Sequence, residues 1–195
     1  MIKDITLTII LLIILFTFFV IDFYFMSQYD SNRKNSGKGW EWSYTLFAIM
    51  IAAVLVLQPV ILPKLGIYTD SPLGIFSQVF GAVCIVFSFV IHIWSRFHLR
   101  HYYTERVEVQ EGHQVILTGP YALVRHPFIT SLFLITGGMF FLNPAITTFL
   151  VLIYTIIDFT SAAKKEEELL SEKVSGYIDY MKRVPRFFPK LGMKT

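Results

Sequence analysis

Residues 73–94 read LGIFSQVFGAVCIVFSFVIHIW, an apolar run that contains no Asp, Glu, Lys or Arg. At about 1.5 Å of rise per residue, a helix of this length crosses the roughly 30 Å hydrocarbon core of a bilayer. The whole chain of 195 residues is 54% hydrophobic and 16% charged, whereas an average soluble domain is roughly 25% charged. The composition therefore predicts an all-α integral membrane protein.

Four further apolar runs accompany this one along the chain: residues 5–21, 43–62, 128–142 and 145–159. The last two are short for a full span, and Asn143 and Pro144 separate them. They predict a helical hairpin whose ends pack against neighbouring parts of the protein, because backbone N–H and C=O groups within lipid need hydrogen-bond partners. The expected fold is a bundle of about five transmembrane helices.

Polarity divides the chain into two regions. Residues 1–94 hold the first three apolar runs and are predicted to form three N-terminal transmembrane helices. Residues 95–195 hold a polar segment, the hairpin 128–159 and a charged tail, 164–195. This second half is the predicted functional region, since it contains most of the side chains that can carry chemistry.

The basic residues predict the orientation. All of the 17 Lys and Arg residues except Lys3 and Lys64 lie in three polar segments, residues 27–41, 95–125 and 164–195. Five spans place these segments on one side of the membrane, and the positive-inside rule assigns that side to the cytosol. We expect a prokaryotic plasma-membrane protein whose active site faces the cytosol.

Two classes of function are disfavoured by composition. The net charge of +3 is too small to argue for a nucleic-acid partner. The single cysteine, Cys84, excludes a disulfide framework and a multi-cysteine metal site. His98, His101 and His113 do not have the spacing of a known metal site, so no metal is predicted.

The segment before the hairpin carries a first motif, GPYALVRHP at residues 119–127. Gly119 and Pro120 signal a turn, and Pro127 suits the first turn of a helix. Arg125 and His126 are therefore expected beside a helix N-terminus, where backbone N–H groups favour an anion. It is equally open at this point that Arg125 only anchors a helix at the lipid headgroups.

The tail carries a second motif, KKEEELL at residues 164–170, followed by Tyr177, Tyr180 and VPRFFP at 184–189. Apolar residues recur every three or four positions between 169 and 181, which predicts an amphipathic helix on the cytosolic side. The simplest interpretation of the three glutamates is a solvated first turn favoured by the helix dipole. Because a hairpin brings its ends together, the two motifs are expected to meet at the membrane surface.

In this order and place, the GPYxxxRHP run and the EExxL, YxxY and VPRxxP tail resemble the isoprenylcysteine carboxyl methyltransferase family over residues 95–191. The resemblance implies S-adenosylmethionine as methyl donor, S-adenosylhomocysteine as product and a lipid-like acceptor that enters from the bilayer. Carried across residue by residue, it implies these donor-binding positions: His113, Gln114, Val115, Ile116, Tyr121, His126, Pro127, Phe128, Ile129 and Glu166.

The side-chain chemistry is compatible with that donor. The Glu166 carboxylate suits an amine or a ribose diol, and Tyr121 or Phe128 can cover the adenine or contact the sulfonium through a cation–π interaction. Arg125 is the candidate catalytic residue, positioning an anionic acceptor or the donor's carboxylate. The expected reaction is methyl transfer to a carboxylate or other oxygen of a lipophilic acceptor.

The sequence departs from the family pattern at two positions. Ile129 stands where the family usually has Tyr, and Ala162 stands where it usually has an Arg that contacts the acceptor. Whether a prenylcysteine is accepted is therefore left open. Three further ionisable residues, Asp22, His92 and Asp158, lie near or within spans, where such groups are either functional or interfacial.

Two other functions remain open. One is an NADPH-dependent membrane enzyme of the sterol-reductase kind, which would need a cluster of Arg and Lys for the extra phosphate. The other is a non-catalytic membrane protein that kept the fold. A soluble Rossmann-type methyltransferase is excluded, because the sequence has no GxGxxG motif and is too apolar.

Overall fold

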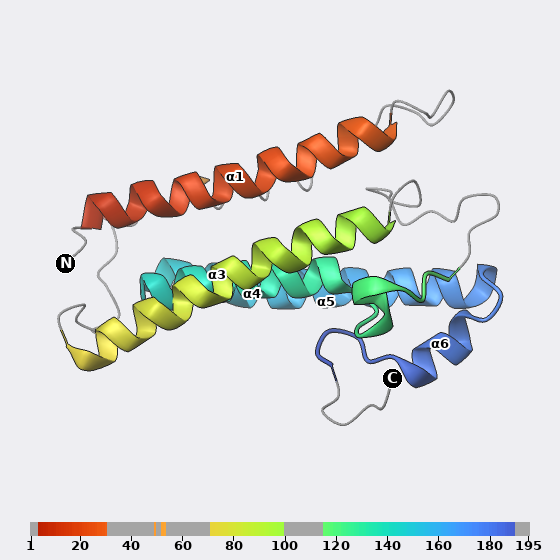
Figure 1. Cartoon of the computed structure of the whole chain (residues 1–195). Helices are drawn as coiled ribbons and strands as arrows, with labels where there is room; N and C mark the ends of the chain where they lie inside the picture. Colours follow the sequence, from red (N-terminus) through yellow and green to blue (C-terminus); the bar gives the residue numbers. More distant parts are fainter. Residues whose placement is uncertain (1–3, 31–48, 50–51, 54–70, 100–114, 190–195) are drawn as a thin grey trace.

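The computed structural model describes residues 4–30, 49, 52–53, 71–99 and 115–189, and these are helical or connect helices (Figure 1). The elements are α1 (Asp4–Asp30), α3 (Pro72–Leu99), the 3-10 turn η2 (Gly119–Ala122), α4 (Pro127–Leu142), α5 (Ile146–Lys173) and α6 (Tyr177–Arg183). The all-α prediction is confirmed for this part of the chain.

Two of the described helices, α3 and α5, are long and apolar enough to cross a membrane. Shorter apolar stretches lie in α1, at Ile9–Phe25, and in α4, at Pro127–Leu142. The predicted run 43–62 falls almost wholly outside the described residues, so the total of five spans stays a prediction.

Small and polar residues form the inner face of α3, which lies against α4. The buried positions recur every three or four residues up to Ser95, and the adjacent Arg96 is buried as well: Gly74, Ser77, Gly81, Ile85, Ser88, His92, Ser95 and Arg96. A Cβ atom added to Gly81 would lie 2.7 Å from the Gly138 carbonyl oxygen, and one added to Gly138 would lie 2.8 Å from the Gly81 carbonyl oxygen. The two backbones therefore touch, as is common where helices pack within membranes.

Hydrogen bonds from serine side chains reinforce this contact. Ser77 Oγ donates to the Phe141 carbonyl oxygen and Ser88 Oγ to the Ser131 carbonyl oxygen, each at 2.7 Å. These bonds lie on either side of the glycine contact along α3. Close backbone approach and side-chain hydrogen bonds together set how α3 crosses the hairpin.

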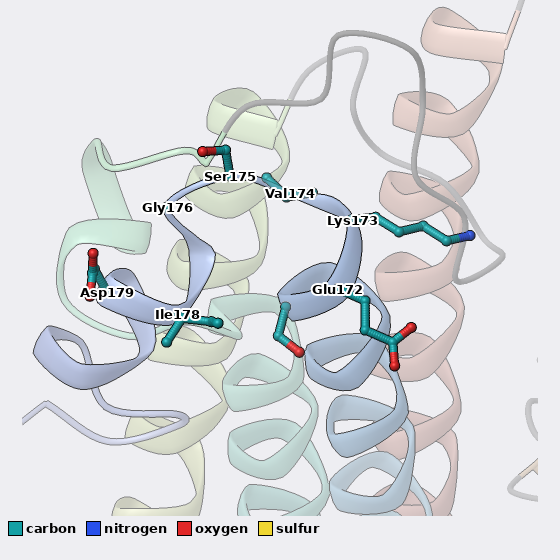
Figure 2. A pocket seen from close by; sticks show the side chains of 8 residues that line it. Glu172, Lys173, Val174, Ser175, Gly176, Ile178 and Asp179 are labelled. Carbon is teal, nitrogen blue, oxygen red and sulfur yellow. The ribbon is translucent and has the colours of Figure 1, made fainter.

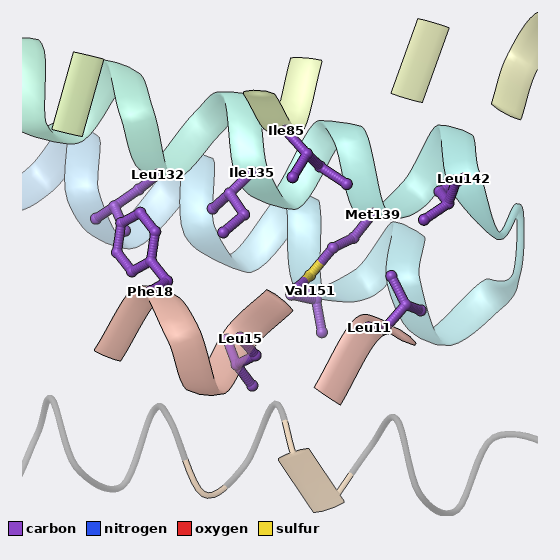
Figure 3. Packing of buried hydrophobic residues seen from close by; sticks show 9 residues of the cluster. All are labelled: Leu11, Leu15, Phe18, Ile85, Leu132, Ile135, Met139, Leu142 and Val151. Carbon is purple, nitrogen blue, oxygen red and sulfur yellow. The ribbon is translucent and has the colours of Figure 1, made fainter. Parts of the chain in front are cut away.

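The hydrophobic core joins α1 to the other three long helices (Figure 3). Leu11, Leu15 and Phe18 of α1 pack against side chains of α4, with Ile85 of α3 and Val151 of α5 completing the cluster. Large apolar side chains also remain on the outside of α1, α3 and α5, for example Phe16 at 71% and Phe76 at 68% exposed. A surface of this kind suits contact with lipid.

The hairpin is confirmed, but its second arm is longer than predicted. The turn between α4 and α5 is held by Thr148, whose Oγ1 donates to the Asn143 carbonyl oxygen at 2.8 Å and accepts from the Ala145 backbone N–H at 3.2 Å. α5 then continues through residues 160–173 without a break. The Ala, Lys and Glu residues there favour helix, and no Gly or Pro interrupts them.

The prediction of one amphipathic helix across the tail is wrong in its continuity. The helix ends at Lys173, and α6 begins at Tyr177 after Gly176, which has a φ of +81°. A glycine in this left-handed conformation allows the reversal that a longer side chain would resist. The apolar face is nevertheless as predicted, because Leu170, Val174, Tyr177 and Tyr180 form one buried cluster.

The described parts of the polar segments 95–125 and 164–195 lie at one end of the bundle. The last turns of α3 and α5, the η2 turn and α6 all gather there (Figure 1). The candidate site is built from these elements.

Candidate active site

Glu167, in the charged turns of α5 beyond its apolar stretch, is the centre of a buried ion network. Its Oε1 accepts a hydrogen bond from Arg125 Nε at 2.9 Å and lies 3.0 Å from His126 Nε2. Its Oε2 accepts one from Arg186 Nη2 at 2.6 Å. The Glu167 side chain is only 2% exposed. Charge-assisted hydrogen bonds from three partners therefore replace the water that this carboxylate loses.

The ion network shifts the pKa values of Glu167 and His126. Burial would raise the pKa of Glu167, but hydrogen bonds from His126, Arg186 and Arg125 outweigh burial and lower this pKa to about 2. Burial would lower the pKa of His126, but hydrogen bonds and charge from Glu166 and Glu167 outweigh it and raise that pKa. His126 thus holds its proton more firmly than a free imidazole, and Glu167 stays ionised.

His126 connects the buried glutamate to the more accessible one. Its Nδ1 lies 3.4 Å from Glu166 Oε2, while its Nε2 faces Glu167. The Glu166 side chain is 43% exposed, and that of His126 is 6% exposed. Glu167 therefore orients His126, and His126 in turn orients a carboxylate that can still reach a ligand.

Residues 184–189, which follow α6 and are called the strap below, lie across the start of α4. Arg125 Nη1 donates to the carbonyl oxygens of Met181 and Val184, at 2.8 Å and 2.5 Å. The backbone N–H groups of Arg125 and His126 donate to the carbonyl oxygens of Pro185 and Arg186, at 2.8 Å and 3.0 Å. The strap supplies partners to N–H groups that a helix start would otherwise leave to water.

The tail also contacts the GPY turn. The Tyr180 hydroxyl donates to the Tyr121 carbonyl oxygen at 2.7 Å, and both residues are buried. Val115, from the first predicted donor strip, packs against the cluster that contains Tyr180. The expectation that the two motifs meet beside the hairpin is confirmed.

The GPY turn rests on the end of α3. Gly119 has a φ of +59°, and a Cβ atom added there would lie 2.3 Å from His98 Cδ2. The His98 Nδ1 lies 3.0 Å from the Trp94 carbonyl oxygen one turn earlier. His98 therefore serves here as a packing surface for the turn, and only a residue without a side chain fits against it.

The structure brings two of the donor-binding candidates, His126 and Glu166, into contact, and the described candidates differ in burial. Tyr121, His126, Pro127 and Ile129 are buried, whereas Val115, Ile116 and Phe128 are half-buried. His113 and Gln114 lie outside the described residues. The partly exposed Glu166 carboxylate beside His126 suits an amine or a diol, and the half-buried Phe128 ring suits an adenine or a sulfonium.

Two residues of the network, Glu167 and Arg186, are not among the site residues predicted from the sequence. A signal for Glu167 exists, because Ala163, Glu167 and Leu170 are the buried positions of this part of α5 and follow helical spacing. Glu166 and Glu168 lie on either side of that stripe. No comparable signal marks Arg186, whose position depends on the strap.

A separate surface depression of about 530 Å³ lies at the turn between α5 and α6 (Figure 2). It is lined by Ser171, Glu172, Lys173, Val174, Ser175, Gly176, Ile178 and Asp179. The candidate donor-binding residues do not line this depression.

Comparison with known proteins agrees with the resemblance seen in the motifs. Residues 81–172 match the isoprenylcysteine carboxyl methyltransferase (ICMT) family. The match includes the GPYxxxRHP run, the hairpin and the three glutamates, and it ends before α6.

Two curated proteins are similar to part of the chain. The nickel-cobalt-cadmium resistance protein NccN of Alcaligenes xylosoxydans xylosoxydans is 30% identical over 82 residues, 41% of this chain and 38% of its own length. The cobalt-zinc-cadmium resistance protein CzcN of Cupriavidus metallidurans is 28% identical over 86 residues, 43% of this chain and 39% of its own length. The chain thus spans about two fifths of the length of the curated relatives it matches. The family match at residues 81–172, just under half of the chain, thus shows that this part of the protein is similar to the isoprenylcysteine carboxyl methyltransferase family.

Proposed function

We propose that the protein is a membrane-embedded methyltransferase that uses S-adenosylmethionine and methylates a carboxylate or other oxygen of a lipophilic acceptor. One observation carries the proposal. His126 of the first motif lies 3.0 Å from Glu167 and 3.4 Å from Glu166 of the second, at one end of a family-matched hairpin. The motifs that resemble the family's donor site therefore form one site.

The proposed donor contacts follow from accessibility. Glu166 keeps nearly half of its side chain exposed and suits the donor's amine or ribose diol. Phe128 is half-buried and offers an aromatic ring for the sulfonium or adenine. Tyr121, Pro127 and Ile129 would shape the walls. The membrane location, with the site on the cytosolic side and the acceptor arriving from the bilayer, is part of the same proposal.

When bound, S-adenosylmethionine supplies an electrophilic methyl group, so transfer breaks its sulfur–methyl bond, forms an oxygen–methyl bond on the acceptor and leaves neutral S-adenosylhomocysteine. A carboxylate acceptor is already ionised near neutral pH and needs no general base. The chain's own residues therefore act by holding the reactants in line and excluding water. Glu167 and His126 contribute by fixing the Glu166 carboxylate.

Arg125 has a structural task besides the catalytic role that its motif suggests. Its guanidinium donates hydrogen bonds to Glu167, to the Met181 carbonyl oxygen of α6 and to the Val184 carbonyl oxygen of the strap, and its side chain is only 9% exposed. Positioning of an acceptor by Arg125 remains part of the proposal. Ala162 is half-buried one turn before Glu166, so the family's usual acceptor-binding arginine has no counterpart there.

Binding of the donor product in detergent or nanodiscs tests this proposal. Isothermal titration with S-adenosylhomocysteine should show saturable binding that Glu166→Ala and His126→Ala weaken strongly. Glu168→Ala is the matched control, because Glu168 is exposed beside the same site and should leave binding unchanged. Absence of binding to the wild-type protein, or equal binding by all variants, would contradict the donor assignment.

Two further measurements separate the alternatives. NADPH binding without S-adenosylhomocysteine binding would favour the reductase-like function. Mass spectrometry of membrane lipid extracts incubated with the protein and methyl-deuterated S-adenosylmethionine should reveal a labelled product. Donor binding without any labelled product would favour the non-catalytic alternative.

The names of the two relatives support a second candidate, a contribution to resistance against nickel, cobalt, zinc or cadmium. Among the described residues, no group of three or more His, Cys, Asp or Glu side chains is placed to hold a metal ion. A resistance role would therefore be sought in growth rather than in metal binding at this site. Comparing host growth with and without the protein in cobalt and cadmium media tests it, and equal growth counts against it.

A further inference from the structure

A second set of ionisable side chains is buried between α1, α3 and α4, apart from the Glu167 network. Asp22 is 1% exposed, His92 is 0% exposed and Arg96 is 1% exposed. Arg96 Nη2 donates a hydrogen bond to Asp22 Oδ1, and His92 Nε2 lies 3.5 Å from the same oxygen. Buried charges of this kind are costly, so their presence within an apolar bundle calls for a function.

The cluster touches the candidate donor site through Phe128. The guanidinium carbon of Arg96 lies 4.2 Å from the centroid of the Phe128 ring, in a cation–π contact. The His92 ring centroid lies 5.4 Å from the same ring. Phe128 is in the first turn of α4, two residues after His126. One face of a proposed donor-binding ring is therefore already occupied by a cation of the protein.

This arrangement has an electrostatic consequence for the donor. S-adenosylmethionine carries a positive sulfonium, whereas S-adenosylhomocysteine has a neutral thioether. As a general estimate, two unit positive charges roughly 10 Å apart at an effective dielectric of about 20 disfavour each other on the order of tenfold in affinity. The Asp22 carboxylate, paired with Arg96, removes this penalty.

We propose that Asp22 is a positioning residue for the methyl donor, acting through Arg96. Its carboxylate holds the guanidinium against Phe128 and neutralises its charge, so that the ring can also face a sulfonium. The inference rests on the proposed function and deepens it. It assigns to α1, which precedes the family-matched residues 81–172, a part in distinguishing the charged donor from its neutral product.

A simpler alternative is that the Asp22–Arg96 pair only fastens α1 to the bundle. If the pair only held α1 in place, its loss would weaken the binding of both ligands equally, because the two molecules differ only by one methyl group and one charge. A change in the ratio of their dissociation constants is expected only if the pair acts through its charge. This ratio therefore distinguishes the two interpretations.

The experiment measures dissociation constants of S-adenosylmethionine and S-adenosylhomocysteine for the full chain in nanodiscs. Asp22→Asn removes a negative charge beside the guanidinium and should weaken S-adenosylmethionine on the order of tenfold more than S-adenosylhomocysteine. Arg96→Gln removes a positive charge beside the Phe128 ring and should shift the ratio in the opposite direction. Asp22→Glu, and the double variant Asp22→Asn with Arg96→Gln, should keep the wild-type ratio.

Either single variant is sufficient if the other fails to fold. Ser77→Ala, which removes a buried hydrogen bond between α3 and α4, is the matched control for a stability loss without a charge change. An unchanged ratio in a folded single variant overturns the inference and leaves the proposed function standing. Failure of the wild-type protein to bind either ligand overturns the proposed function and the inference with it.

Discussion

Glu167 Oε1 lies 2.9 Å from Arg125 Nε, although 42 positions separate the two residues in the chain. The contact joins the end of the polar segment before the hairpin to the charged extension after it. Arg125 in turn bonds the carbonyl oxygens of Met181 and Val184. A single buried carboxylate thus connects three segments that the sequence keeps apart.

Glu167→Gln should destabilise the folded protein by on the order of 3 kcal/mol, because it leaves two arginines and a histidine around a neutral group. Thermal unfolding followed by circular dichroism in detergent measures the change. Glu168→Gln is the control, since Glu168 is exposed on the same turn and should shift the unfolding free energy by less than about 0.5 kcal/mol. Equal midpoints for the two variants would contradict a central role for Glu167.

Stability should depend on pH in two directions. The raised pKa of His126 contributes stability that is full below its ordinary value of 6.5 and is lost as pH rises through the folded-state pKa. The lowered pKa of Glu167 contributes stability that is full above its ordinary value of 4.5 and is lost as pH falls toward about 2. Maximum stability of the network is expected between these two ordinary values.

Unfolding midpoints measured between about pH 3 and about pH 9, at intervals of roughly one pH unit, test this dependence. His126→Gln should abolish the decline on the alkaline side and leave the acid side in place. A decline above neutral pH that persists in His126→Gln would assign the effect to another group.

Gly119→Ala should destabilise the GPY turn by at least about 2 kcal/mol, because the new Cβ would overlap the His98 ring and φ is +59°. Gly176→Ala is the matched control: φ is +81° there, but nothing lies within 4 Å of the added Cβ. It should cost only the backbone strain, about 1–2 kcal/mol. Adding His98→Ala to Gly119→Ala should recover the steric part of the loss, and no recovery would mean that His98 is not the obstacle.

Gly81→Ala should push α3 away from α4 and cost about 1–3 kcal/mol, because its Cβ would lie 2.6 Å from the Leu142 backbone nitrogen. Gly137→Ala should be neutral or stabilising, since its Cβ would meet only Leu152 Cδ1 at 3.9 Å and alanine favours helix. Thermal unfolding of both variants measures the difference. Similar losses at both glycines would exclude a specific close approach at Gly81.

The apolar runs at 73–94 and 128–142 were predictable as helices because nearly every residue in them favours lipid or protein over water. The turn at Asn143 and Pro144 was predictable for a local reason, since Pro144 interrupts the apolar pattern. The pairing of the two motifs followed from the hairpin, because its arms must return to the same surface.

The sequence motif pointed to Glu166 and gave Glu167 no role, although the two neighbours differ greatly in burial. A run of three glutamates contains one on each face of a helix, and the face is set by the packing of Leu170 and Ala163. The break at residues 174–176 depends on Gly176, whose left-handed backbone is an option that a glycine allows but does not require.

By itself, the sequence determined the apolar helices, the hairpin and the residue types that gather at its polar end, because these depend on local apolarity and on short motifs. Only the tertiary structure decided which carboxylate is buried among Arg125, His126 and Arg186, and that Asp22 of α1 pairs with Arg96 beside Phe128. The physical reason is that a charge is stabilised in a low-dielectric interior only by partners within a few ångströms. Those partners come from helices that are distant in the chain.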